Sequence, residues 1–398
     1  MKDVFVVDAL RTPIAKYSGA LSSIRPDDLA ALVIKKLIER NPNLDVNEIE
    51  DVIFGAANQA GEDNRNVARM AALLAGLPVS VGGNTVNRLC ASGLQSIVDA
   101  SRAIECGDGE IYIAGGSESM TRAPFSMAKS DSAFGRTTEI YDTTIGWRFT
   151  NKKLSEIYYP YSMGETAENI AEKWKITREA QDEFAFNSQE KYQQAHIANK
   201  FSNEIIAVSV PQKKGIEVLF EKDEHPRKTS IEELAKLNPA FKKEGTVTAG
   251  NSSGLNDGAA ALLLVSENAV KKYNLTPLAR IVARGVAGVD PTIMGIGPVP
   301  ATQKALKRAG LTIDDIGLME LNEAFASQSL ACIKDLKINP QIVNVNGGAI
   351  ALGHPLGCSG SRISATLIHE MQKQNVKFGV ATMCIGVGQG VAVVFEKI

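Results

Sequence analysis

CASGLQSIVDASRAI, residues 90–104, is a stretch whose pattern returns later in the chain. Its apolar residues recur at three- and four-residue steps, which is typical of an amphipathic helix, and its cysteine stands directly before that helix. CSGSRISATLIHEM begins at Cys358, 268 residues further on, with the same order of cysteine, small residues and helical pattern. One such pair could arise by chance, so the flanking elements decide what it means.

Two strand-like segments repeat at the same spacing. DVNEIEDVIFG at 45–55 resembles TIDDIGLMELN at 312–322, and IYIAGG at 111–116 corresponds to FGVATMC at 378–384. Strands that alternate with helices predict an α/β fold. Three elements in one order, at an offset of 267–268 residues, predict two homologous halves that arose by duplication.

The segment between the halves has a different character. Residues 124–249 carry more charge and more aromatic side chains, and they include a polar helical pattern around 165–200. The chain then passes through AGNSSGLNDG into a buried-strand pattern, AAALLLVS. We therefore expect three parts: a first half formed by 1–123 and 250–276, an inserted loop domain at 124–249 that covers a site, and a second half at 277–398.

Composition limits the classes of function. The chain has 398 residues, of which 44% are hydrophobic, and a formal net charge of −2, so no basic face for nucleic acid or for an acidic membrane is expected. No window approaches the roughly 18 uninterrupted apolar residues of a membrane span. The start, MKDVFVVDALRTP, predicts an opening strand rather than a signal peptide, and the end, VAVVFEKI, predicts a closing strand.

The cysteines and histidines indicate a compartment and argue against a metal site. Five cysteines, an odd number with no CxxC pair, favour free thiols in a reducing, cytoplasmic location. The four histidines form no HxxxH or HExxH pair, so we expect no bound metal. Cys106 and Cys332 lie within apolar helical patterns, and we expect both in the core.

Two cysteines are candidates for chemistry. Cys90 stands at a helix N-terminus, where the positive end of the helix dipole and unpaired N–H groups lower a thiol pKa; the alternative is a small core residue. Cys384 precedes the glycine-rich turn IGVGQG, whose N–H groups could face an oxyanion. Its alternative is a strand-end cysteine before an ordinary turn.

Two polar residues complete the set of candidates. His354 lies in NGGAIALGHPLGCSG, residues 346–360, and is either a general base or a turn histidine. Asn322, in ELNEAFA, follows a strand and precedes a helix, so it either holds a water or a carbonyl oxygen or caps the helix. Nucleotide-binding motifs do not occur: GxxxxGK[ST] is absent, and neither glycine-rich run has the GxGxxG spacing.

These motifs together resemble the thiolase family. The cysteine before a helix, NEAFA, GGAIALGHPLGCSG and CIGVGQG occur in the family's order, and the resemblance covers essentially the whole chain. It implies an αβαβα sandwich of two halves, each with a five-stranded mixed sheet, plus a loop domain inserted in the first half. It also implies CoA as a substrate, no permanently bound cofactor, a role of the fatty-acid β-oxidation type, and a homo-oligomer, either a dimer or a tetramer.

The resemblance assigns roles in the cleavage of a 3-ketoacyl-CoA to acetyl-CoA and a shortened acyl-CoA, and in the reverse Claisen condensation. Cys90 attacks the 3-keto carbon and carries the acyl group as a thioester, His354 takes its proton, and Cys384 protonates the departing carbanion. Asn322 holds a water at one oxyanion, and the N–H groups of Cys90 and Gly386 face the other. Met163, Phe241, Ala324, Phe325 and Met294 match apolar walls of the family's CoA tunnel. Ser253 matches a serine that contacts the pantetheine, and Leu154 matches a residue near the adenine.

Substrate range and two rival functions stay open at this point. Some short-chain members have histidine where this chain has Ser162, which disfavours an acetoacetyl-CoA-specific acetyltransferase, and DTTIGWRF at 142–149 looks more like the enzymes for longer or 3-oxoadipyl chains. A ketoacyl synthase or hydroxymethylglutaryl-CoA synthase is disfavoured by Cys384. A non-catalytic CoA- or lipid-binding relative is disfavoured by the full set of reactive groups. Cys358 mirrors Cys90, and its reactivity is undecided.

Overall fold

The first half of the molecule is built on a mixed sheet. The computed structural model describes residues 2–398. The strands of this half run in the order β4-β3-β5-β10-β1, with β3 parallel to both neighbours and β10 antiparallel to both of its own. Their bounds are β1 (Val4–Arg11), β3 (Asp51–Gly55), β4 (Gly82–Val86), β5 (Ile111–Ser119) and β10 (Asn256–Ser266), and the short β2 (Ala15–Lys16) pairs with β10.

The second half repeats this sheet with one reduced strand. Its order is β12-β13-β14-β11, for β11 (Ala279–Gly288), β12 (Leu318–Leu321), β13 (Phe378–Ile385) and β14 (Gln389–Lys397). The place that β4 holds in the first half is taken by a single parallel bridge between Met319 and Val343. Pro340 lacks an N–H donor and Asn344 has a φ of 47°, so the chain leaves the sheet on both sides of this bridge. The expected five strands are therefore four strands and a bridge.

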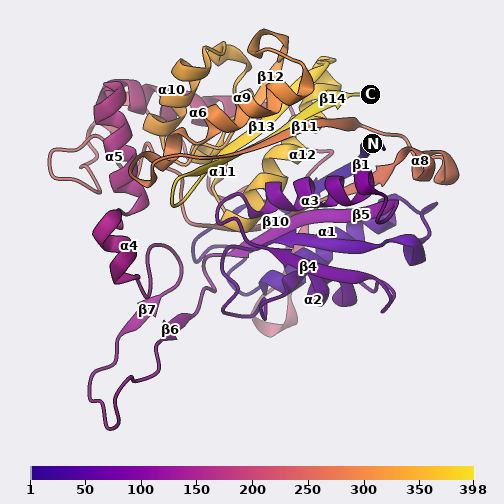
Figure 1. Cartoon of the computed structure of the whole chain (residues 1–398), viewed down its shortest axis with the longest axis horizontal. Coiled ribbons are helices and arrows are strands. Elements are labelled where there is room, and N and C mark those ends of the chain that lie inside the picture. Colours follow the sequence, from indigo (N-terminus) through magenta and orange to yellow (C-terminus); the bar gives the residue numbers. More distant parts are fainter. Residues whose placement is uncertain (1) are drawn as a thin grey trace.

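The two sheets meet and enclose a central helix layer (Figure 1). Two residue pairs between β1 and β11 join the halves into one ten-stranded sheet. α3 (Ser92–Cys106) and α12 (Leu356–Gln374) pack against each other and against both sheets in one apolar cluster. α1 (Pro26–Arg40) and α2 (Val67–Leu74) cover the outer face of the first sheet, and α9 (Pro298–Ala309) and α10 (Ala326–Leu336) that of the second. The predicted αβαβα sandwich is confirmed.

The repeated small residues of the opening motif explain how close the two central helices lie. A Cβ on Gly93 would sit 2.6 Å from the carbonyl oxygen of Gly357, and one on Gly360 would sit 2.1 Å from the backbone nitrogen of Leu94. Any larger residue would force the helices apart. Duplicated glycines in CASG and GCSG thus bring the starts of α3 and α12 together.

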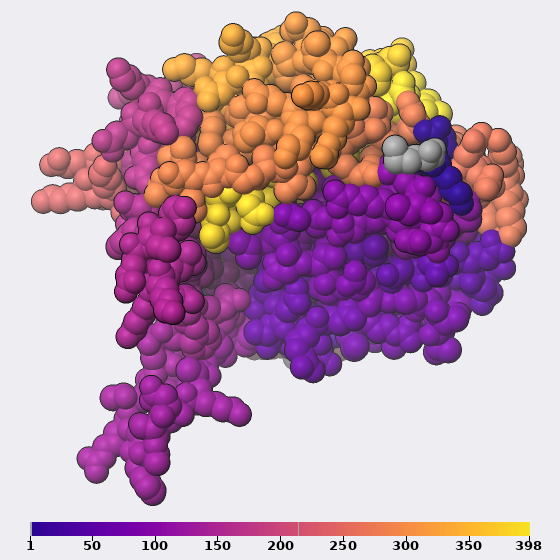
Figure 2. All heavy atoms as spheres, viewed as in Figure 1, coloured from indigo at the N-terminus to yellow at the C-terminus, as the bar shows by residue number. Residues whose placement is uncertain are grey.

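The inserted segment forms a covering layer and an arm. The arm carries the hairpin of β6 (Phe125–Met127) and β7 (Ile140–Asp142), and Figures 1 and 2 show it projecting from the body. The helix expected around 165–200 is two helices, because Lys175 ends the first in the left-handed region and Thr177 caps the second. The elements are α4 (Lys152–Ile157), α5 (Met163–Trp174), α6 (Arg178–Ile197), β8 (Val208–Pro211), β9 (Glu217–Phe220) and α7 (Ile231–Ala235).

Two further expectations have clear outcomes. Cys332 is buried as expected, but Cys106 is exposed: it is the last residue of α3, and Gly107, at φ 89°, turns the chain away.

The other helices are α8 (Glu267–Tyr273) and α11 (Ala349–Leu352). Within residues 2–398, no helix combines the length and the apolar character needed to cross a bilayer.

Candidate active site

Cys90 is held in a tight, strained turn between β4 and α3. Leu89, the residue before it, has a φ of 49°, which costs a residue with a Cβ about 1–2 kcal/mol. Side chains on both sides support this conformation: the amide of Leu89 donates to Oδ1 of Asn87 at 2.8 Å, and the hydroxyl of Ser92 donates to the carbonyl of Leu89 at 2.6 Å. Cys90 therefore stands fixed at the head of α3.

The protein surroundings keep the Cys90 thiol protonated. Burial raises its pKa, and the N–H groups of Gly386 and of Cys90 itself, which donate towards the sulfur, offset only part of this effect. The prediction that the helix N-terminus lowers the pKa of Cys90 is therefore wrong, because desolvation raises this pKa by more than the neighbouring N–H groups lower it. For Cys90 to act as a nucleophile, a base must accept its proton.

The turn between β13 and β14 brings Gly386 and Cys384 to Cys90. Pairing of Ile385 with Gln389 leaves a three-residue tip at 386–388, in which Val387 has a φ of 63°. A positive φ is rare for a β-branched residue, and such strain concentrates at functional sites. Cys384 is buried, and burial together with the neighbouring Cys90 raises the pKa of its thiol well above the ordinary value.

Hydrogen bonds fix the tautomer of His354. The ring Nδ1 lies 2.6 Å from the hydroxyl of Ser359, and that hydroxyl donates its single proton to the carbonyl of Pro355 at 2.8 Å. Ser359 must therefore accept from Nδ1–H, which leaves the lone pair on Nε2. Nδ2 of Asn322 lies 3.4 Å from Nε2. Ser359 was not among the predicted site residues, although it lies five residues after His354 in the motif NGGAIALGHPLGCSG.

Burial also keeps the imidazole neutral. It lowers the pKa of His354 to about 3, with the charge of Arg362 acting in the same direction. The backbone N–H of His354 donates to Oδ1 of Asn256 at 2.9 Å, so the short link between α11 and α12 is tied to β10. His354 is thus an uncharged ring whose Nε2 can accept a proton.

Asn322 does not cap a helix. α10 begins at Ala326 with Phe325 at the cap, and the Asn322 side chain faces His354 instead. Its Oδ1 is buried, and no donor among the described residues reaches it. The next residue, Glu323, is anchored by Ser188, Asn344 and the N–H of Ile350, which positions the NEAFA segment. A buried acceptor beside the His354 ring is suited to a water or a substrate group.

A cavity of about 280 Å³ opens at Cys90, and Met163 and Gly386 also line it. Its wall includes two charged residues that were not among the predicted site residues, Glu118 and Arg148. Burial raises the pKa of Glu118 to about 7. Glu118 lies in the sequence SES at the end of β5, and a charged residue at the end of a buried strand is the sequence feature that could have indicated it.

The residues expected along the CoA tunnel contact one another, and Leu154, which was expected near the adenine, lies apart from them. Met294, Ala324, Phe325 and Cys384 pack in one apolar cluster with Met163. The N–H of Ser253 donates to the carbonyl of Ala324 at 3.0 Å, and Phe241 stacks edge-on against Phe325 with ring centres 6.1 Å apart. Leu154 lies exposed on α4, outside this cluster.

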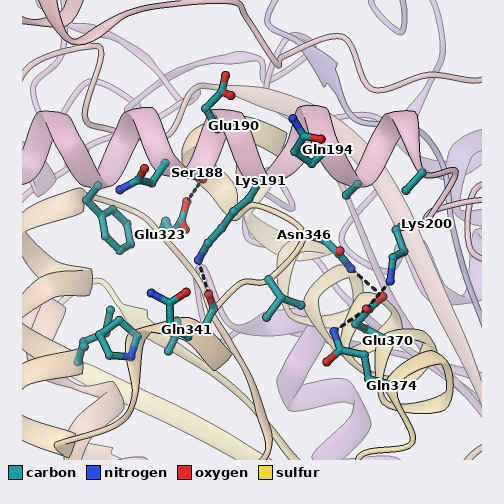
Figure 3. Close-up of a pocket in the computed structure, with 18 of the residues that line it drawn as sticks. Ser188, Glu190, Lys191, Gln194, Lys200, Glu323, Gln341, Asn346, Glu370 and Gln374 are labelled. Carbon is teal, nitrogen blue, oxygen red and sulfur yellow. Dashed lines mark hydrogen bonds and ion pairs between the residues drawn. The ribbon is translucent and has the colours of Figure 1, made fainter.

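A larger cavity, of about 690 Å³, lies beside α6 (Figure 3). Its charged groups, apart from the exposed Glu190, have partners within the protein: Lys191 donates to the carbonyl of Val343, and Glu370 accepts from Lys200 and Asn346. We therefore attribute a structural role to this cluster. Within residues 2–398, no group of three or more histidine, cysteine, aspartate or glutamate side chains is arranged to hold a metal ion.

Cys358 contributes nothing to either cavity. It is fully buried against Ile14 and Ala260, and burial raises the pKa of its thiol to about 12. A thiol with that pKa is inert at neutral pH. The mirrored cysteine is thus a core residue, which decides the question left open by the sequence.

Two cysteines, a neutral histidine with a free lone pair and backbone N–H groups directed at Cys90 are the groups that acyl transfer through a cysteine requires. Family models agree: residues 4–268 match the thiolase N-terminal domain and residues 275–397 the thiolase C-terminal domain. The chain belongs to the thiolase family, acyltransferases that cleave or condense acyl-CoA.

Similar proteins cover the full length. The 3-oxoadipyl-CoA/3-oxo-5,6-dehydrosuberyl-CoA thiolase of Escherichia coli is 54% identical over 401 residues, and the beta-ketoadipyl-CoA thiolase of Pseudomonas aeruginosa is 55% identical over 400, each with 100% of both chains covered. Among solved structures, the Bacillus anthracis acetyl-CoA acetyltransferase has a TM-score of 0.93 at 42% identity, covering 100% of this chain and 99% of that one. The structure of human mitochondrial 3-ketoacyl-CoA thiolase in complex with CoA has a TM-score of 0.92 at 43% identity, covering 100% of this chain and 98% of that one.

Proposed function

We propose that this thiolase cleaves 3-oxoadipyl-CoA with CoA to give acetyl-CoA and succinyl-CoA, and catalyses the reverse condensation. The observation that carries the reaction is the approach of Gly386 N–H and Cys384 to Cys90, with the Nε2 lone pair of His354 oriented by Ser359. The acyl chain is taken from the names of relatives at 54% and 55% identity. A role in fatty-acid β-oxidation stays a prediction, because those names describe dicarboxylic chains.

The first half-reaction forms the acyl-enzyme. Cys90 Sγ attacks C3 of the substrate while its proton passes to Nε2 of His354, so a neutral thiol becomes a nucleophile only at the moment of attack. The N–H groups of Cys90 and Gly386 donate to the oxygen on C3. Losing one such donor typically costs about 3 kcal/mol of transition-state stabilisation.

The C2–C3 bond then breaks, and its electron pair moves onto C2 as the enolate of acetyl-CoA. Cys384 gives its proton to C2, and Asn322 with His354 stabilises the enolate oxygen. The proton on His354 returns to the Cys384 thiolate, which leaves a neutral histidine for the second half. A CoA thiol then attacks the thioester, its proton passes through His354 to Cys90 Sγ, and the acyl-CoA leaves.

The CoA arm is assigned to the face of the inserted segment. We propose that Met163, Met294, Ala324 and Phe325 form apolar walls, that Phe241 extends them, and that Ser253 contacts the pantetheine. Leu154, exposed on α4, is suited to an adenine ring that stacks outside the cavity. CoA is a substrate in this scheme, and no permanent cofactor takes part.

A short-chain, acetoacetyl-CoA-specific enzyme is the second candidate, and the cavity argues against it. A water takes about 30 Å³ of liquid volume, so about 280 Å³ exceeds the need of a three-atom acetyl group. Ser162, where some short-chain members have histidine, caps α5 in a reciprocal pair with Glu165. Ser162 lines the cavity, and its side chain takes up less space there than a histidine would.

Organisation and location are proposed on separate grounds. The division into 1–123 with 250–276, 124–249 and 277–398 agrees with β10 lying between β5 and β1. A homo-oligomer, dimer or tetramer, is supported by the projecting arm, on which Phe125, Met127, Phe134 and Ile140 are exposed. Five unpaired cysteines are typical of a reducing compartment and favour the cytoplasm.

Steady-state kinetics test the proposed substrate. We expect kcat/KM for thiolysis to be at least about 10-fold higher with 3-oxoadipyl-CoA than with acetoacetyl-CoA or 3-oxohexanoyl-CoA, because an extra matched group contributes about 1.4 kcal/mol or more. 3-Oxohexanoyl-CoA has the same six-carbon chain with a methyl end, so it isolates the carboxylate. Higher kcat/KM with acetoacetyl-CoA would support the short-chain candidate instead.

A further inference from the structure

Arg148 is the unpaired cation of the cavity beside Cys90. It is half-buried in the cavity wall, and its Nη1 donates to the carbonyl of Thr143 at a long 3.5 Å. Among residues 2–398, no carboxylate lies within ion-pair distance of it. Arg122, which is also half-buried, instead pairs with the carboxylate of Glu62. A guanidinium has five N–H donors, so Arg148 has donors free for a ligand.

The backbone around Arg148 is anchored on both sides. Nδ2 of Asn58 donates to the hydroxyl of Thr143 at 2.8 Å, which fastens one end of DTTIGWRF to the β3 side of the cavity. Nε1 of Trp147 donates to the carbonyl of Tyr161 at 2.9 Å, which fastens the other end. A cation on an anchored segment loses less entropy when it binds a ligand.

The other charged group of the cavity wall does not compete for Arg148. The two oxygens of Glu118 accept from the N–H groups of Ala57 and Gly357, both at 2.8 Å, and of Asn58 at 3.1 Å. Glu118 therefore has partners within the protein. The most suitable ligand for the free guanidinium is an anion brought in by the substrate.

We propose that Arg148 binds the carboxylate at the far end of the acyl chain and so selects ω-carboxyl 3-oxoacyl-CoA substrates; this inference rests on the proposed function. Adipyl and suberyl groups, in the name of the Escherichia coli relative, both derive from dicarboxylic acids. The planar guanidinium matches a carboxylate with two parallel charge-assisted hydrogen bonds. A methyl-ended chain would leave the guanidinium without that partner inside the cavity.

The test compares two substrates across matched variants. For Arg148→Gln, the ratio of kcat/KM for 3-oxoadipyl-CoA to kcat/KM for 3-oxohexanoyl-CoA should fall about 10- to 100-fold, the range for a lost charged hydrogen bond. Arg148→Lys, which keeps the charge but not the fork, should give an intermediate ratio. Arg102→Gln removes an exposed arginine of α3 outside the cavity and should leave the ratio as in the wild type.

The outcomes separate this inference from the proposed function. A wild-type enzyme with no preference for 3-oxoadipyl-CoA would overturn the proposed function. A wild-type preference that Arg148→Gln retains in full would overturn the role of Arg148 alone. Thermal unfolding of each variant confirms that it is folded, and because the readout is a ratio of substrates, a general loss of active enzyme cancels.

Discussion

The basicity of His354 depends on a hydroxyl five residues further along the chain. The hydroxyl of Ser359 accepts a hydrogen bond from Nδ1–H and donates one to the carbonyl of Pro355. The lone pair of the ring therefore stays on Nε2, which faces Asn322. Burial alone would not determine which ring nitrogen of His354 carries the proton. This arrangement makes Ser359 a positioning residue, which acts through the ring rather than on the substrate.

Replacing Ser359 by alanine should lower kcat/KM for thiolysis about 5- to 100-fold. The change leaves the buried Nδ1–H without an acceptor, a cost of about 1–3 kcal/mol, and it permits the wrong tautomer. Ser364→Ala is the matched control, since Ser364 is buried on the same helix and, among the described residues, donates to Gly360 alone. Equal losses in the two variants would show a general effect on α12 instead. Thermal unfolding measures that effect separately.

At the scale of elements, glycines with different roles form the β13–β14 turn. Gly386 has space beside it, since an added Cβ would lie 3.4 Å from Leu89 and 3.5 Å from Met163. Gly388 has a φ of 81°, and an added Cβ would lie 2.3 Å from the carbonyl oxygen of Val289. One glycine therefore keeps the cavity open, and the other makes the turn possible.

Alanine at these two positions should separate activity from stability. We expect Gly386→Ala to change the free energy of unfolding by less than about 0.5 kcal/mol, and to lower kcat/KM about 10-fold by crowding the acyl group at Cys90. Gly388→Ala should destabilise the protein by at least about 1–2 kcal/mol, because of its φ and its clash. Denaturant unfolding and thiolysis assays measure both. The reverse pattern would contradict the assigned roles.

The sequence predicted these elements where the signal was local or repeated. Helical periodicity and the duplication predicted α3, α12 and the strands around them, and four motifs singled out the candidate catalytic residues, whose roles stay a prediction. It could not predict what depends on packing. Desolvation raises the pKa of Cys90 although the helix dipole, which the sequence shows, lowers it. The segment DTTIGWRF was singled out for substrate range, but its sequence does not show that Arg148 lines the cavity, and no motif marked Glu118. Cys106 fits an apolar helix pattern, yet lies at the helix end.

For the molecule as a whole, Glu118 connects the two halves at the site. It belongs to β5 of the first half and accepts from Ala57 and Asn58 there, while its third donor is Gly357, at the start of α12. Since His354 lies three residues before Gly357, this hydrogen bond also ties the chain next to His354 to the first half. Duplication gave two similar halves, and the site forms where their central helices begin.

Replacing Glu118 by glutamine should destabilise the protein and flatten its response to pH. The new side chain would turn an amide N–H towards backbone donors and lose at least one of three hydrogen bonds, about 1–3 kcal/mol. In the wild type, the folded-state pKa of about 7 lies above the ordinary 4.5. The folded protein therefore holds more protons between these values, and this group lowers the free energy of unfolding as pH rises through the window.

Urea denaturation at pH 5 and pH 7 measures that effect. From these pKa values, Glu118 should make the wild type lose about 2 kcal/mol between the two conditions, a loss that Glu118→Gln should not show. Glu172→Gln is the control: Glu172 is an exposed residue of α5, and its variant should respond to pH as the wild type does. If Glu118→Gln kept the wild-type difference, the carboxyl that joins the halves would not be the group that takes up the proton.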